Sequence, residues 1–126
     1  MLLDTHVAIG RLTETRKLPA ELLAMIASRD NEVFVSAASI CEIAIKFPLR
    51  RAGAPPFDGY AARYLKTVGY SFLDISVEHA AANGHLKTVH ADPFDRLLIA
   101  QAVTEPLTLI TRDSKVAGYS PTFITW

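Results

Sequence analysis

The order of apolar segments constrains this fold most, because short apolar runs alternate with longer stretches that have helical spacing. Strands are predicted at residues 1–3, 33–35, 70–75 and 107–110, with an edge strand at residues 122–126. Strands that alternate with helices in this way are typical of a parallel sheet covered by helices on both faces. We therefore expect an α/β fold.

The helices between these strands are predicted from apolar residues that recur at helical spacing. They are expected at residues 5–13, from 19 onward, and at 36–47, 57–68, 77–86 and 92–103, with a short helix headed by Asp113. The one long loop is expected at residues 50–56, where glycine and two prolines gather. We find no internal repeat and expect a single domain over residues 1–126.

Charge and cysteine content restrict the classes of function. Thirteen basic and thirteen acidic residues give a formal net charge of zero, which argues against broad electrostatic wrapping of nucleic acid. Cys41 is the only cysteine, so a disulfide framework and a cysteine-rich zinc site are excluded. In its apolar run, Cys41 should behave as a small hydrophobic side chain. We see no signal peptide or membrane-spanning stretch and expect a cytoplasmic protein with no membrane partner.

Two aspartates, Asp4 and Asp113, follow predicted strands. Ligands of open parallel α/β sheets bind beyond the carboxyl ends of the strands. Right-handed connections keep these ends at one edge of the sheet, so the two carboxylates can be neighbours. Taken singly, each is explained more readily as a helix N-cap, because both precede helical stretches.

Glu42 is the only charged residue in the apolar run from Val33 to Ile45. A carboxylate in so apolar a helix is costly unless it is paired or binds a metal. The alternative is a surface ion pair with Lys46, four residues further along the same helix. Both interpretations stay open.

Asp92 and Asp95 flank the start of another predicted helix. Asp92 precedes Pro93, which suits an N-cap followed by proline at the first helical position. Asp95 then lies at the third helical position, where the helix dipole favours its ionised form. A capping-box bond is its structural alternative, although glutamate or glutamine makes that bond better.

Four carboxylates that converge cannot all stay ionised without a cation. Ligand sets made only of oxygen suit Mg²⁺ or Mn²⁺ rather than zinc. The histidines are scattered and show no spacing typical of zinc ligands, and no glycine-rich phosphate loop is present.

Four segments, taken in order, closely resemble PIN-domain proteins, and among these the VapC-like toxins of bacterial type II toxin–antitoxin modules. The segments are residues 2–6 (LLDTH), 36–46 (SAASICEIAIK), 90–102 (HADPFDRLLIAQA) and 109–113 (LITRD). The resemblance runs from residue 2 to about residue 119, and the second and third segments are its most specific parts.

The resemblance implies a PIN-like three-layer fold with a central parallel sheet of four or five strands. It implies a Mg²⁺- or Mn²⁺-dependent endoribonuclease that acts as the toxin of a type II pair. The implied catalytic residues are Asp4, Glu42, Asp95 and Asp113, of which Asp4, Asp95 and Asp113 would be metal ligands, with Thr111 and Asp92 in support. Implied partners are an RNA substrate, a VapB-like antitoxin and a second copy of the chain, assembled as a heterotetramer or larger. DNA would be contacted only through the antitoxin.

Contacts to RNA are expected from a local basic rim, whose candidates are Lys46, Arg50, Arg51, Arg96 and Arg112. Gly10 and Cys41 stand where relatives often carry tryptophan, which puts packing near the site in doubt but touches no ligand. The alternative function is a catalytically weak PIN-like module that binds RNA or a partner without cutting. A phosphohydrolase of another α/β family is a weaker alternative, because its usual aspartate motif and phosphate loop are missing.

Overall fold

The structure is a computed structural model that describes residues 1–13, 15–46, 57–87 and 91–126. Four strands form one sheet in the order β3-β2-β1-β4, and all neighbouring strands run parallel. The strands are β1 (Leu2–Leu3), β2 (Phe34–Ser36), β3 (Ser71–Leu73) and β4 (Leu109–Ile110). This confirms the predicted parallel sheet. Residues 122–126 do not complete a fifth strand, since Ile124 makes only an isolated parallel bridge to Ile110.

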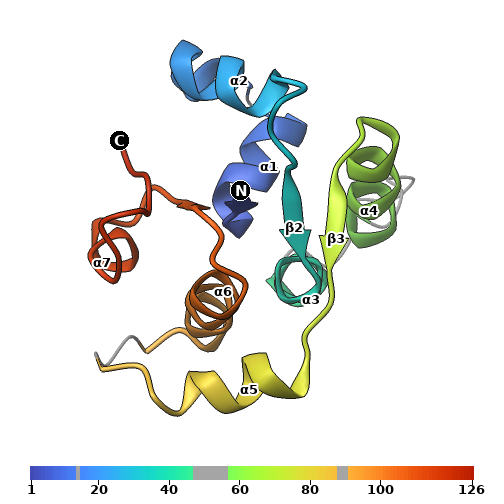
Figure 1. Cartoon of the computed structure of the whole chain (residues 1–126). Coiled ribbons are helices and arrows are strands. Elements are labelled where there is room, and N and C mark those ends of the chain that lie inside the picture. The colour runs from blue at the N-terminus through green and yellow to red at the C-terminus, as the bar shows by residue number, and fades with distance from the viewer. Residues whose placement is uncertain (14, 47–56, 88–90) are drawn as a thin grey trace.

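Helices connect and cover the strands (Figure 1). They are α1 (Thr5–Thr13), the 3-10 turn η1 (Thr15–Lys17), α2 (Ala20–Ala27), α3 (Ala37–Lys46), α4 (Phe57–Thr67), α5 (Val77–Asn83), α6 (Pro93–Thr104) and α7 (Ser114–Ala117). The predicted loop at residues 50–56 lies outside the described residues. In the described part of the chain, no helix is long and apolar enough to cross a membrane.

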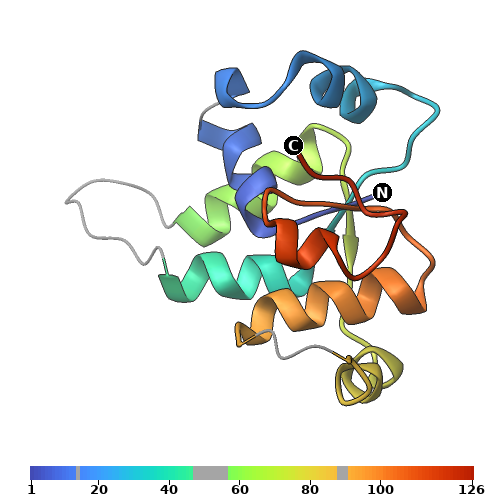
Figure 2. The ribbon, with the colours of Figure 1, turned by 90° about the vertical axis from the view of Figure 1, so that its left-hand side faces the viewer.

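Successive residues of a strand point to opposite faces of the sheet, and each face has its own core. Leu2 and Leu109 belong to one cluster, which also takes in apolar residues of α6 and α7. Their chain neighbours Leu3 and Ile110 belong to the other cluster, which takes in residues of α1, α2 and α4. All four strand residues are fully buried. The result is a three-layer arrangement with the sheet between two sets of helices, as Figures 1 and 2 show.

Local sequence explains how α4 ends and how α6 begins. At the end of α4, Gly69 adopts a φ of 92°, and the N–H of Tyr70 donates to the Leu65 carbonyl at 3.0 Å. This is a Schellman ending, which favours glycine because the left-handed conformation strains other residues. At the start of α6, Asp92 accepts hydrogen bonds from the Phe94 and Asp95 amides, and Pro93 occupies the first turn.

Helix α5 lies outside α6 and is attached to it by polar contacts (Figure 2). The buried ring of His79 accepts a hydrogen bond from the Ser76 amide at Nδ1 and contacts Glu105 through Nε2 at 2.8 Å. Arg96 donates to the Asn83 carbonyl at 2.8 Å. These contacts give His79 and Arg96 structural roles between the two helices.

Candidate active site

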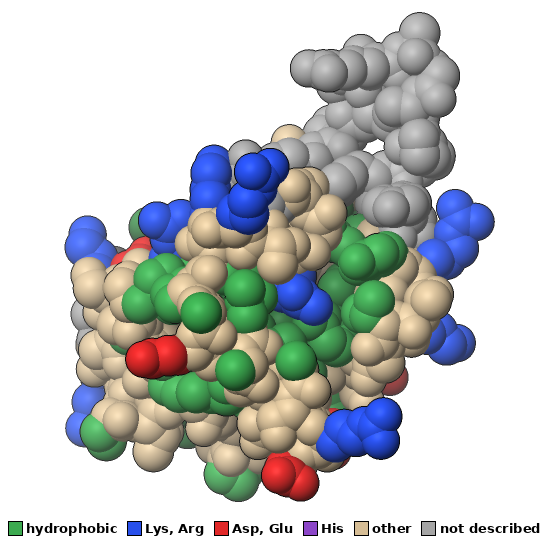
Figure 3. All heavy atoms as spheres, turned by 90° about the horizontal axis from the view of Figure 1, so that it is seen from above, with side chains coloured by type: hydrophobic (Ala, Val, Ile, Leu, Met, Phe, Trp, Pro, Cys, Tyr) green, Lys and Arg blue, Asp and Glu red, His purple; other side chains and the backbone are tan. Residues whose placement is uncertain are grey.

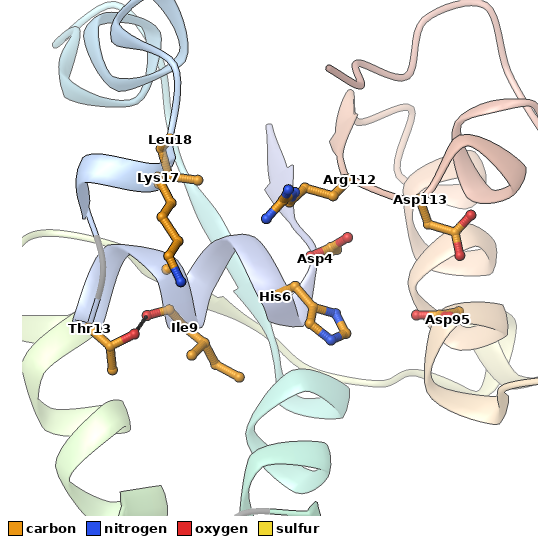
Figure 4. Close-up of a pocket in the computed structure, with 10 residues that line it drawn as sticks. Asp4, His6, Ile9, Thr13, Lys17, Leu18, Asp95, Arg112 and Asp113 are labelled. Carbon is orange, nitrogen blue, oxygen red and sulfur yellow. Dashed lines mark hydrogen bonds between the residues drawn. The ribbon is translucent and has the colours of Figure 1, made fainter.

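The structure brings three of the four predicted carboxylates to one pocket of about 500 Å³. Asp4 follows β1, Asp113 follows β4, and Asp95 lies in the first turn of α6. Because β1 and β4 are parallel neighbours, the residues after them lie at the same edge of the sheet. Figure 4 shows Asp95 and Asp113 on one side of the pocket, with Asp4 between them and the opposite wall.

Asp4 is nearly buried, with 6% of its surface exposed. Its Oδ1 accepts the Val7 amide at 2.9 Å and so caps the start of α1. Burial raises the pKa of Asp4, although hydrogen bonds from Thr111 and Val7 and the charge of His6 act in the opposite direction. Asp4 is therefore a carboxylate whose ionised form the protein alone stabilises poorly.

Thr111 connects two of the carboxylate positions. Its side chain is fully buried, and it makes a hydrogen bond to the Asp4 carboxylate. The same hydroxyl oxygen accepts the Asp113 amide at 3.0 Å. The Thr111 hydroxyl therefore lies between the two acids that follow β1 and β4.

Asp113 and Asp92 both act as helix caps, in agreement with their structural interpretation. Asp113 Oδ1 accepts the Lys115 amide at 2.7 Å and the Val116 amide at 3.4 Å at the start of α7. Asp92 Oδ1 accepts the Phe94 amide at 2.8 Å and caps α6, so Asp95 is not the N-cap of that helix. Asp113 can cap α7 and line the pocket at the same time, because the start of α7 lies at the pocket.

Glu42 does not line this pocket. Its side chain is only 2% exposed, and Oε2 receives the Lys46 ammonium at 2.5 Å. The other oxygen, Oε1, is buried without a hydrogen-bond partner in the described part of the chain. The predicted i, i+4 pair therefore exists, but its acid is buried rather than on the surface.

Lys46 bridges two acids, because it also contacts Asp92 Oδ2 at 3.2 Å. The hydrogen bond to Glu42 raises the pKa of Lys46. Burial acts to raise the pKa of Asp92, but the hydrogen bond from Lys46 and those from the Phe94 and Asp95 amides hold it below its ordinary value.

The wall of the pocket opposite the acids carries one basic residue, Lys17, among Ile9, Thr13 and Leu18. Lys17 lies across from Asp95 and Asp113, while His6 and Arg112 lie between (Figure 4). Of the predicted RNA contacts, Arg112 lines the pocket and Lys46 and Arg96 do not. Arg50 and Arg51 lie outside the described residues. Lys17 and His6 were not predicted to line the pocket. Nothing in the sequence around either residue distinguishes it from an ordinary side chain on the surface.

The two positions where relatives often carry tryptophan have different surroundings. Gly10 lines the pocket, and a Cβ built there would meet only the flexible Leu18 side chain, at 3.5 Å. Cys41 is exposed, so its expected behaviour as a small core residue is wrong. The buried residues Glu42 and Ile43 take the inward side of α3 and leave Cys41 facing outward.

The donor chemistry of this region fits a hard divalent cation. Carboxylate oxygens are the ligands that Mg²⁺ and Mn²⁺ prefer. A cation would compensate the buried charge of Asp4 and could satisfy the unpartnered Oε1 of Glu42, which otherwise costs free energy. However, no three His, Cys, Asp or Glu side chains of the described residues lie close enough together to hold one ion.

Positive charge is unevenly distributed over the face seen from above in Figure 3. Several Lys and Arg side chains lie close together at one part of this face, whereas others lie singly among hydrophobic and other side chains.

Comparison with known proteins gives one family and a consistent fold. The family model described as PIN domain matches residues 1–120. The chain is similar to VapBC2 from Rickettsia felis, solved bound to a DNA fragment from their promoter, with a TM-score of 0.71 and 17% identity over 99% of this chain and 96% of that chain. It is also similar to a toxin–antitoxin complex from Klebsiella pneumoniae (TM-score 0.68, 21% identity, 98% and 95% covered).

A third similar structure is FitAcB from Neisseria gonorrhoeae, with a TM-score of 0.68 and 19% identity over 98% of this chain and 95% of that chain. At such identities the likeness establishes the fold alone. No protein of curated function matches the sequence.

Proposed function

The chain belongs to the PIN-domain family, and from this premise we propose that it is a Mg²⁺- or Mn²⁺-dependent endoribonuclease, the toxin of a type II toxin–antitoxin pair. One observation carries the proposal: Asp4, Asp95 and Asp113 come from three separate segments and line one pocket. An inert domain would need these aspartates only as caps, and Asp95 is not the N-cap of its helix.

The proposed reaction is hydrolysis of an RNA phosphodiester. A bound divalent cation would supply Lewis-acid polarisation of the phosphate and a more acidic water. Asp4, Asp95 and Asp113 would hold that cation, and Glu42 would bind it or orient the attacking water. Thr111 would keep the Asp4 carboxylate in position through its hydrogen bond, and Asp92 would fix the first turn of α6.

RNA would enter across the side of the pocket that carries Lys17. Arg112 and Lys17 line the pocket, and their positive charge would suit a phosphate next to the one being cut. Lys46 and Arg96, two further expected RNA contacts, already contact other residues: Lys46 contacts Glu42 and Asp92, and Arg96 contacts Asn83. The geometry therefore favours Arg112 as the first RNA contact to test.

The proposed partner is a VapB-like antitoxin, with a homodimer of this chain inside a heterotetramer or larger complex. The support is that the similar structure from Klebsiella pneumoniae is a toxin–antitoxin complex. The VapBC2 complex is bound to promoter DNA, and we propose that this chain meets DNA only through its antitoxin. The proposed location is the cytoplasm.

Cleavage of a defined RNA tests the activity. The wild-type chain should cut the RNA internally with Mn²⁺ or Mg²⁺ and stop when the metal is chelated. Asp95→Asn should lower the rate by at least about 100-fold, because it removes a charge needed for the cation without removing a helix cap. Asp30→Asn is the matched control, since Asp30 is exposed in a turn away from the pocket, and it should cut at the wild-type rate.

One observation favours the alternative, a PIN-like module that binds RNA or a partner without cutting: the described donors do not approach closely enough to hold an ion together. That alternative predicts RNA binding that Asp95→Asn leaves unchanged, and no cleavage with any metal. A folded Asp95→Asn variant that cuts at the full rate would contradict the assignment of the site.

A further inference from the structure

Lys46 sits between two acids that belong to different helices. Its ammonium lies 2.5 Å from Glu42 Oε2 on α3 and 3.2 Å from Asp92 Oδ2 at the start of α6. It also lies 5.6 Å from the centre of the Phe94 ring, within range of a cation–π interaction. Three different groups therefore fix the position of one exposed lysine at the end of its helix.

The pair with Glu42 is asymmetric in burial. The side chain of Lys46 is 45% exposed, whereas that of Glu42 is 2% exposed. A surface pair would gain little, but here the lysine compensates a carboxylate that water does not reach. Lys46 occupies only Oε2 and leaves Oε1 buried without a partner in the described structure.

The contact with Asp92 extends this effect to α6. Asp92 uses Oδ2 for Lys46 and Oδ1 for the amides of Phe94 and Asp95. The same carboxylate that receives Lys46 therefore also anchors the backbone of Asp95, which lines the pocket. One chain of contacts leads from Glu42 through Lys46 and Asp92 to Asp95.

We infer that Lys46 is a positioning residue of the acidic site, and this inference rests on the proposed metal-dependent function. Lys46 holds Glu42 by one oxygen and leaves the other, which is buried and has no partner in the described structure, as the oxygen that a cation would satisfy. It also sets the start of α6, and with it Asp95, relative to α3. It acts through these two acids and is not a contact for RNA phosphate.

The direction in which Mn²⁺ affinity changes when Lys46 is replaced distinguishes this positioning role from competition between Lys46 and the cation for Glu42. If Lys46 only competed with a cation for Glu42, its removal would lower the repulsion and tighten Mn²⁺ binding. If it positions the acids, its removal should weaken Mn²⁺ binding about tenfold, as is typical when a residue that orients metal ligands is lost. We expect the second result for Lys46→Met, which keeps most of the aliphatic side chain.

The experiment is calorimetric titration of the full chain with Mn²⁺. Lys46→Arg should restore most of the affinity, because a guanidinium can reach both acids. Lys66→Met is the matched control, since Lys66 is an exposed lysine on α4, and it should bind Mn²⁺ as the wild type does. Tighter or unchanged binding in Lys46→Met overturns the inference.

A second variant covers the case in which Lys46→Met fails to fold. Asp92→Asn keeps an oxygen for the cap of α6 but removes the charge that receives Lys46, so it should also weaken Mn²⁺ binding. In the double variant the two losses should be less than additive, because both act along one chain of contacts. Full affinity in Asp92→Asn, or strictly additive losses, would contradict the chain of contacts. Failure of the wild type to bind Mn²⁺ contradicts the proposed function itself, which the variants alone cannot do.

Discussion

Asp4 stabilises the chain as a helix cap and destabilises it as a buried charge. Its Oδ1 accepts the Val7 amide, while burial raises its pKa above the ordinary value. Asparagine at this position keeps an oxygen for the cap and removes the charge. Asp4→Asn should therefore abolish metal-dependent cleavage and yet raise the free energy of unfolding of the metal-free protein at pH 7.

The pH dependence of this effect has a definite sign. Below the pKa of the unfolded chain, Asp4 is protonated in both states and its burial costs no charge. As the pH rises through the raised pKa of the folded state, the unfolded chain releases its proton more readily, and the wild type loses stability. Urea unfolding with a chelator present should show the advantage of Asp4→Asn at pH 7 and its loss near pH 3. A variant less stable than the wild type at pH 7 would show that the cap needs the carboxylate.

The place of a single residue in the fold could be predicted where a strand end or a helix cap fixes it, and not where it depends on which face of a helix meets the core. Asp4 and Asp113 follow from the ends of two parallel strands. Glu42 left two interpretations open, because the sequence does not tell which side of α3 meets the core. In the structure Glu42 both pairs with Lys46 and is buried. Lys17 could not be placed, since its approach to the pocket depends on how η1 packs against the rest of the chain.

At the scale of elements, two glycines test how backbone conformation and the space around a residue each contribute to the free energy of unfolding. Gly10 lies inside α1 with room for a Cβ beside Leu18, so Gly10→Ala should stabilise the chain by about 0.5–1 kcal/mol through helix propensity. Gly69 has open space around it but a φ of 92°, so Gly69→Ala should destabilise it by about 1–2 kcal/mol. Thermal or urea unfolding measures both, and the same sign for both would refute the argument.

Elements were easiest to predict where several local signals agree. The sequence of α6 combines an N-cap, a proline in the first turn and an apolar face, and its predicted and observed extents agree closely. The strand predicted at residues 70–75 is shorter in the structure, as β3 (Ser71–Leu73). An edge strand pairs on one side only, so its length depends on its neighbour β2 rather than on its own composition.

At the scale of the whole molecule, a net charge of zero limits how RNA can bind. If Arg112 and Lys17 supply the main phosphate contacts, the logarithm of RNA affinity should fall with the logarithm of salt concentration with a slope of about −1.4. Arg112→Gln should reduce this slope by about 0.7. Fluorescence anisotropy of a labelled RNA, with catalytically inactive protein, gives the slope. A slope steeper than about −5 would require a basic surface beyond the pocket.

The three-layer architecture follows from the sequence because alternation within two-residue strands already assigns each leucine to a face. The pocket can be predicted only in part from the sequence, because its shape depends on how α1, α6 and the start of α7 pack against one another. The parallel sheet brings Asp4 and Asp113 to one edge, whereas the closeness of Asp95 is a result of packing.

The central claim is that Asp4, Asp95 and Asp113 form one cation site. Anomalous diffraction from crystals grown with Mn²⁺ tests it most directly. We predict a Mn²⁺ peak in the pocket, bonded to oxygens of at least two of these three aspartates, and its loss in Asp95→Asn crystals. A well-ordered pocket without such a peak at saturating Mn²⁺, or a peak that persists unchanged in the variant, would contradict the claim.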